Sequence, residues 1–116
     1  MFASFTPAIS PRSAKKIRQQ ARRWRLHLRT SQSLNDIAHS VNPAIRGWVN
    51  YYGAYQRSTL LPVLHDIDYH LVKWVKRKYK KKGKYSKRAI RWLGQVAYHQ
   101  PALFAHWSLG APFPAE

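Results

Sequence analysis

The side chains of this sequence that could bind a metal or transfer a proton are few and widely spread. Only four carboxylates are present: Asp36, Asp66, Asp68 and Glu116. Asp66 and Asp68 stand two residues apart on a predicted helix, so they point to opposite sides and cannot share a metal there. We predict that this pair contributes to solvation or charge balance.

The histidines show no catalytic or metal-binding pattern either. The six histidines are His27, His39, His65, His70, His99 and His106, without an HExxH or similar arrangement. Five residues separate His65 from His70, a poor spacing for two ligands on one helix, so we interpret the histidines as isolated surface or half-buried residues. The sequence also lacks cysteine, a glycine-rich phosphate loop and a nucleophile in a recognisable local signature. We predict no metal, no cofactor and no enzymatic activity for this chain on its own.

Net charge is the strongest signal in the composition. Lys and Arg number 21 and Asp and Glu 4, so the formal charge is +17 at pH 7. A domain with this charge repels itself, and neutralising phosphates with release of counterions is the usual compensation. Membrane binding is the weaker alternative, because the cations alternate with a helical core pattern and no segment approaches the roughly 20 apolar residues of a membrane span. We expect an intracellular nucleic-acid-binding protein, cytoplasmic and bacterial-type, with no membrane partner.

The cations are densest in residues 73–91. This span contains no acid and eleven cations: Lys73, Lys76, Arg77, Lys78, Lys80, Lys81, Lys82, Lys84, Lys87, Arg88 and Arg91. Trp74, Tyr79 and Tyr85 lie among them, and Trp92 follows, which suggests rings that stack on bases. A solvated helix face is the alternative, and the absence of acids weakens it. We predict that this segment contacts nucleic acid.

A second candidate is residues 42–55, NPAIRGWVNYYGAY. Ile45, Trp48, Val49 and Tyr52 recur at helical spacing, and we interpret this stripe mainly as core. Gly47, beside Trp48, is predicted to permit close packing of another helix. The segment is therefore mainly architectural.

One edge of the same segment is polar. Arg46 and Asn50 are four residues apart and share a face with Asn42. Arg46 either clamps an RNA phosphate, holds a backbone carbonyl or stays solvated, and these alternatives remain open. Tyr51 either stacks on an unpaired base or lies with its hydroxyl at the rim of the core. We include Arg46, Asn50 and Tyr51 in the predicted RNA-binding set.

The fold predicted to position these residues is all-α, with about four helices in a small bundle that has a basic face. No run alternates with period two for long enough to form a strand. The first helix has Ser10 as N-cap and Pro11 in its first turn, and the polar residues 30–32 end it. Its predicted core positions are Ala14, Ile17, Ala21, Trp24 and Leu28.

The second helix is predicted to begin with a capping box formed by Ser33 and Asp36. Pro43 lacks an amide and disfavours helical geometry at Asn42, so we predict a kink or break there, with Asn42 as a fresh N-cap. This helix should close at Gly53 and residues 56–58. Its predicted apolar positions before the proline are Leu34, Ile37, Ala38 and Val41.

The third and fourth helices follow from the same periodicity. The third starts at Ser58 or Thr59, has Pro62 in its first turn and ends near Gly83. Its core positions are Leu60, Leu64, Ile67, Leu71, Trp74 and Val75. The fourth starts at Ser86, ends before Pro101 and buries Ala89, Ile90, Leu93, Val96 and Ala97. A short apolar hook of Leu103, Phe104 and Trp107 completes a domain of residues 10–110, between a linker of residues 1–9 and a tail of residues 111–116.

Four stretches of this chain resemble one known family. SLNDIAHSVNPAIRGWVNYYGAY from Ser33 resembles the signature block of the group II intron maturase-specific domain, or domain X, which forms the thumb region of intron-encoded reverse transcriptases. KWVKRKYKK from Lys73 is similar to that family's basic helix. SFTPAIS from Ser4 resembles the segment that joins the polymerase palm to this domain, and LFAHWSLG from Leu103 resembles the end of many bacterial members.

The resemblance implies a domain that binds structured group II intron RNA and assists its folding and splicing. The Tyr-x-Asp-Asp strand of the family's palm and its His-Asn-His endonuclease are both absent from the sequence. Two alternatives stay open. The chain is either the thumb part of a reverse transcriptase, truncated or acting with a palm domain in trans on RNA–DNA duplex, or a general basic DNA-binding protein.

Overall fold

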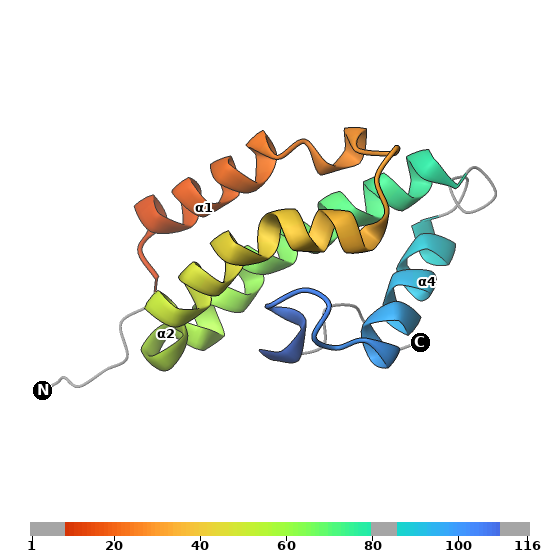
Figure 1. Ribbon diagram of the computed structural model, residues 1–116. Helices are drawn as coiled ribbons and strands as arrows, with labels where there is room; N and C mark the ends of the chain where they lie inside the picture. The colour runs from red at the N-terminus through yellow and green to blue at the C-terminus, as the bar shows by residue number, and fades with distance from the viewer. Residues whose placement is uncertain (1–8, 80–85, 110–116) are drawn as a thin grey trace, which may run out of the picture.

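The computed structural model describes residues 9–79 and 86–109, without side-chain placement for residues 53–57 and 86. Within this part the helices are α1 (Pro11–Arg23), η1 (Leu26–Leu28), α2 (Leu34–Lys78), α4 (Ser86–His99) and η2 (Trp107–Leu109), as Figure 1 shows. No described residue forms a strand. The predicted all-α class is confirmed.

Helix α1 begins as predicted and ends earlier. The Ser10 hydroxyl accepts a hydrogen bond from the Ser13 amide at 3.1 Å, and Pro11 occupies the first turn. The predicted continuation to Leu28 is wrong, because Arg25 adopts the left-handed conformation at φ 49° and breaks the helix. The break shifts the periodicity, so Leu26 is buried while Leu28 is 49% exposed.

Helix α2 begins with the predicted capping box. The Ser33 hydroxyl accepts from the Asp36 amide, and the Asp36 carboxylate accepts from the Ser33 amide, both at 3.1 Å. The hydrogen bonds from the backbone and then the side chain of Ser33 lower the pKa of Asp36 below its ordinary value. Two of the amide groups that a helix start leaves unpaired are thereby satisfied.

Of the kink or break predicted at Pro43, the break does not occur, and the assignment of Asn42 as a fresh N-cap is wrong. Helix α2 continues through Pro43 without interruption. Proline removes only the bond to the His39 carbonyl, and both residues are exposed, so solvent can hydrate that carbonyl. Asn42 is buried instead, inside the helix.

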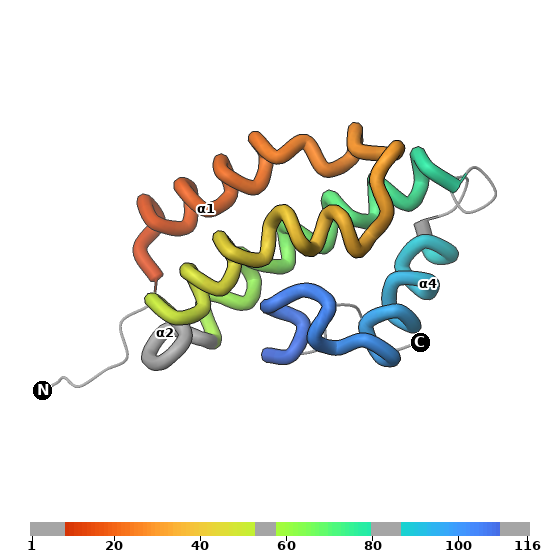
Figure 2. Tube along the Cα trace, in the orientation of Figure 1, coloured from red at the N-terminus to blue at the C-terminus, as the bar shows by residue number. Residues whose placement is uncertain are grey.

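Helix α2 folds back on itself. A straight helix of its 45 residues would measure about 67 Å, longer than the 54 Å extent of the whole molecule. In Figures 1 and 2 the first arm, residues 34–52, runs one way and the second arm, residues 58–78, returns beside it. The two antiparallel helices expected from the sequence are therefore present as arms of one helical run. The reversal of direction falls between residue 52 and residue 58, where the second helix was predicted to close, although the helical assignment continues through these residues.

The core lies between the arms, α1, α4 and the C-terminal hook. The second arm supplies its most deeply buried apolar residues, which are Leu60, Leu64, Ile67, Leu71, Trp74 and Val75, each 0% exposed. Helix α4 begins and ends as predicted and buries Ala89, Leu93 and Ala97. Phe104 and Trp107 of the hook are buried as well, with ring centroids 4.7 Å apart. The predicted stop at Gly83 lies outside the described residues.

Candidate nucleic-acid interface

We call residues 73–91 the basic segment. Its described residues lie at the C-terminal end of α2 and in the N-terminal part of α4. Its exposed cations in the described residues are Lys73, Arg77, Lys87, Arg88 and Arg91, and Lys76 is half-buried. Lys80, Lys81, Lys82 and Lys84 lie outside the described residues. Lys87 and Arg88 stand in the first turn of α4, which contains no acid. Cations are unfavourable there beside the helix dipole, and a bound phosphate would offset both positive charges.

The aromatic residues of this segment serve mainly the core. Trp74 is fully buried and its indole N–H donates to the Arg29 carbonyl at 2.8 Å, so it is not the stacking surface that its position among the lysines suggested. The Tyr79 ring lies between two tryptophans, 6.1 Å from Trp74 and 5.6 Å from Trp92. This cluster joins the end of α2 to α4. Tyr85 lies outside the described residues.

Two lysines of the segment differ in environment. The Lys78 ammonium donates to the Gln32 carbonyl and lies 5.0 Å from the centre of the Trp74 ring, so it ties α2 to the loop before it. The Lys73 ammonium lies 4.7 Å from the centre of the Tyr69 ring, which is 58% exposed. Sequence reasoning missed Tyr69. Its spacing of four residues before Lys73 and of eight before Arg77 was the available signal.

The motif of residues 42–55 divides into a core side and an exposed edge, as predicted for most of its residues. Ile45 is fully buried, while Trp48 and Tyr52 are half-buried against the core. The Trp48 ring packs against that of Trp24, the C-cap of α1, with ring centroids 5.7 Å apart. A Cβ added at Gly47 would meet nothing within 4 Å, so the predicted role of this glycine in close helix packing is wrong.

Arg46, Asn50 and Tyr51 form the exposed edge of the first arm. All three are exposed, and Tyr51 is 78% exposed. Its ring meets Tyr52 edge-on at 4.8 Å. The alternative that placed the Tyr51 hydroxyl at the rim of the core is therefore excluded, and the ring is presented to solvent.

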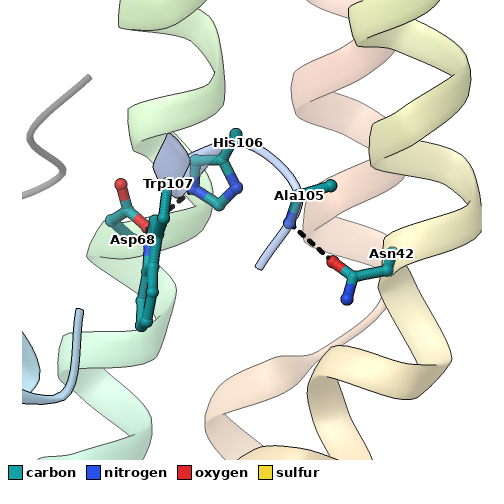
Figure 3. A network of polar contacts seen from close by, with 5 residues as sticks. All are labelled: Asn42, Asp68, Ala105, His106 and Trp107. Atoms are coloured by element: carbon teal, nitrogen blue, oxygen red, sulfur yellow. Dashed lines mark hydrogen bonds and ion pairs between the residues drawn. The ribbon is translucent and has the colours of Figure 1, made fainter. Parts of the chain in front are cut away.

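Asn42 does not belong to this edge. Its amide nitrogen donates to the Leu103 carbonyl and its amide oxygen accepts from the Ala105 amide, both at 2.9 Å. The side chain thus satisfies two backbone groups of the hook that another backbone segment would otherwise bind. Figure 3 shows the bond from Ala105. The signal in the sequence was its position four residues after Ala38, on the buried side of the first arm.

Asp68 holds the hook from the second arm, opposite Asn42 in Figure 3. It is 2% exposed, and one carboxylate oxygen accepts from the Trp107 indole at 2.8 Å and lies 2.8 Å from His106 Nε2. The predictions that Asp68 serves solvation or charge balance and that His106 lies at or near the surface are wrong. Its position four residues after Leu64 and three before Leu71 placed Asp68 on the core face.

Asp66 pairs with His70 one helical turn on, at 3.4 Å. Burial lowers the pKa of His70 below its ordinary value, the Asp66 charge opposes this, and the charges of Lys73 and His27 add to the lowering. His27 of η1 and Lys73 of α2 are therefore both close enough to His70 to act on it. Among the described residues, no group of three or more His, Cys, Asp or Glu side chains is arranged to hold a metal ion.

Comparison with known protein families gave a match over most of the chain. The family model described as "Group II intron, maturase-specific domain" matches residues 14–92. Searches of curated proteins and of solved structures found no match. None of the described helices combines the length and the apolar character required to cross a membrane.

Proposed function

The chain belongs to the group II intron maturase-specific domain family, and from this premise we propose that it binds folded group II intron RNA and assists its splicing. The family's domain is a non-catalytic part of reverse transcriptase–maturases. The proposed RNA surface consists of the basic segment and the exposed edge of the first arm. It includes the cations of residues 80–84, which lie outside the described residues.

The observation that carries the proposal is the position of the exposed cations within the matched region. Arg46, Lys73, Arg77, Lys87 and Arg91 all fall in residues 14–92, and each is exposed. In the described residues the salt bridges are both between His and Asp, so no carboxylate of the described part forms a salt bridge with these five side chains. Exposed, uncompensated cations are the groups that release counterions when phosphates bind.

The exposed edge adds a means of choosing RNA over duplex DNA. Tyr51 presents its ring to solvent, and an exposed ring can stack on an unpaired base at roughly 1–3 kcal/mol per base. Arg46 can form two parallel hydrogen bonds with a phosphate. Folded intron RNA offers unpaired bases beside a bent backbone, whereas regular duplex DNA offers only the backbone at this surface.

A competition experiment tests the proposal. Labelled, folded group II intron RNA is bound to the full chain at fixed salt, and unlabelled intron RNA or a random DNA duplex of equal phosphate concentration is added. We expect intron RNA to compete at least tenfold better. Equal competition would instead indicate a general basic DNA-binding protein, and a preference for RNA–DNA duplex would indicate a polymerase thumb.

The surface is tested with a matched pair of double variants. Lys73→Gln with Arg77→Gln removes two charges from the proposed surface, and Arg12→Gln with Lys16→Gln removes two exposed charges from α1. We expect the first double variant to weaken RNA binding clearly more than the second. Equal weakening would show that only net charge matters.

A further inference from the structure

An open depression lies where α1 ends and η1 begins. Its volume is about 340 Å³, and it is lined by Gln19, Arg22, Arg23, Arg25 and His27. Arg22, Arg23 and Arg25 are exposed at its wall, and His27 is half-buried. Three arginines and a histidine thus line one hollow outside both parts of the surface proposed above.

The arginines of this depression have no carboxylate partner in the described residues. Asp36 is engaged in the capping box, Asp66 pairs with His70, and Asp68 is buried against the hook. Three arginines close together repel one another, and only an anion from outside the described residues would neutralise them.

The backbone at Arg25 is a second, independent observation. Arg25 is the non-glycine residue with positive φ among those described, at φ 49° and ψ 49°. It follows the helix cap Trp24, a position where glycine is usual because a Cβ disfavours left-handed geometry. Glycine would adopt this geometry at a lower conformational cost. The turn alone therefore does not account for an arginine at this position.

We propose that this depression binds phosphate groups of the RNA backbone, as a second anchoring point distinct from the basic segment. The guanidinium forks of Arg22, Arg23 and Arg25 match the geometry of phosphate oxygens, and Gln19 and His27 add hydrogen-bonding groups at the wall. This inference rests on the proposed function, since RNA is the polyanion that it places here.

The depression also adjoins the basic segment. The charges of His27 and Lys73 both act on His70, which places the η1 wall of the depression near the second arm of α2. RNA held by the arginines would therefore continue onto the edge formed by Tyr69 and Lys73. One RNA segment would then bridge α1 and α2.

The test compares salt dependence of RNA binding between two double variants of the full chain. Arg22→Gln with Arg23→Gln changes the depression. Arg12→Gln with Lys16→Gln changes exposed charges of the same helix, with Arg12 about 15 Å from Arg22 along the axis. Each lost phosphate contact lowers the slope of log K against log salt by roughly 0.7 to 0.9. We expect the slope to fall by roughly 1.4 to 1.8 for the first pair, the sum of two such losses, and to change little for the second.

Arg25→Gly supplies an independent check that does not depend on helix content. Glycine accepts the left-handed geometry, so this variant should melt at the same temperature as the wild type or higher, and still bind intron RNA more weakly. Equal slopes for the two double variants, or unchanged RNA affinity of Arg25→Gly, would overturn the second anchoring point while leaving the proposed function intact. Absence of RNA binding by the wild type would overturn both.

Discussion

Replacing Asp68 with alanine tests the buried contacts that hold the hook on the second arm. The change leaves the Trp107 indole N–H and His106 Nε2 without their partner at 2.8 Å, in a place where solvent does not reach. An unsatisfied buried hydrogen-bonding group costs about 1–3 kcal/mol, and the change leaves two of them. We therefore expect Asp68→Ala to lower the free energy of unfolding by about 2–6 kcal/mol, from the roughly 5–15 kcal/mol of a small domain.

Urea unfolding followed by circular dichroism at pH 7 measures this loss, and Asp66 provides the control. Asp66 lies two residues away and its side chain is 34% exposed, so Asp66→Ala should cost less than about 1 kcal/mol. Asp68→Asn should fall between the two, because its amide oxygen can still accept the indole hydrogen bond. If Asp68→Ala and Asp66→Ala were equally stable, the buried contacts would not hold the hook and the reasoning would be refuted.

Three further predictions concern individual residues. Gly47→Ala should stabilise the protein by about 0.5–1 kcal/mol in thermal melts, because the added Cβ meets open space inside a helix; a loss would show that the site is crowded. Arg46→Ala should leave the melting temperature unchanged and weaken RNA binding. Trp48→Ala removes a half-buried ring and should lower the free energy of unfolding by about 2 kcal/mol. An unfolded Arg46→Ala would show that this arginine is structural. The pKa of His70 lies below 6.5, so the unfolded chain binds the proton more tightly and stability should rise with pH up to about 6.5. His70→Gln should make the free energy of unfolding depend less on pH below about 6.5. If the variant and the wild type showed the same pH dependence, His70 would not be the group responsible.

Local rules predicted the helix starts and the core stripes well. The caps at Ser10 and Ser33 depend on residues three apart, and both formed as expected. The stripe from Leu60 to Val75 repeats at helical spacing, and all six of its predicted positions are buried. Patterns of this kind are set by neighbours in the sequence, so they can be recognised without knowing the fold.

Long-range contacts account for most of what the sequence did not reveal. Asn42 meets residues 61 and 63 positions away, and Asp68 meets residues 38 and 39 positions away. The neighbouring residues in the sequence do not reveal the distant hydrogen-bond partners of such a residue. Its place on an apolar helix face indicates only that it is buried. The break at Arg25 escaped prediction for another reason, since arginine carries no preference for left-handed geometry.

The candidate interface was predictable as a set of cations but not as a surface. Composition identified the basic segment and the exposed edge, yet it could not show that Trp74 and Lys78 face the core while Lys73 and Arg77 face solvent. The depression at Arg25 was also hidden, because it depends on a helix end at Arg23, well before the predicted end at residues 30–32.

Splicing of a group II intron RNA in vitro, at a magnesium concentration too low for self-splicing, tests the central claim most directly. The purified 116-residue chain at stoichiometric concentration should raise the splicing rate. The Lys73→Gln, Arg77→Gln double variant should raise it less than the Arg12→Gln, Lys16→Gln control. A rate that does not change with added protein, at a concentration where the RNA is fully bound, would contradict the proposal that this domain assists intron splicing.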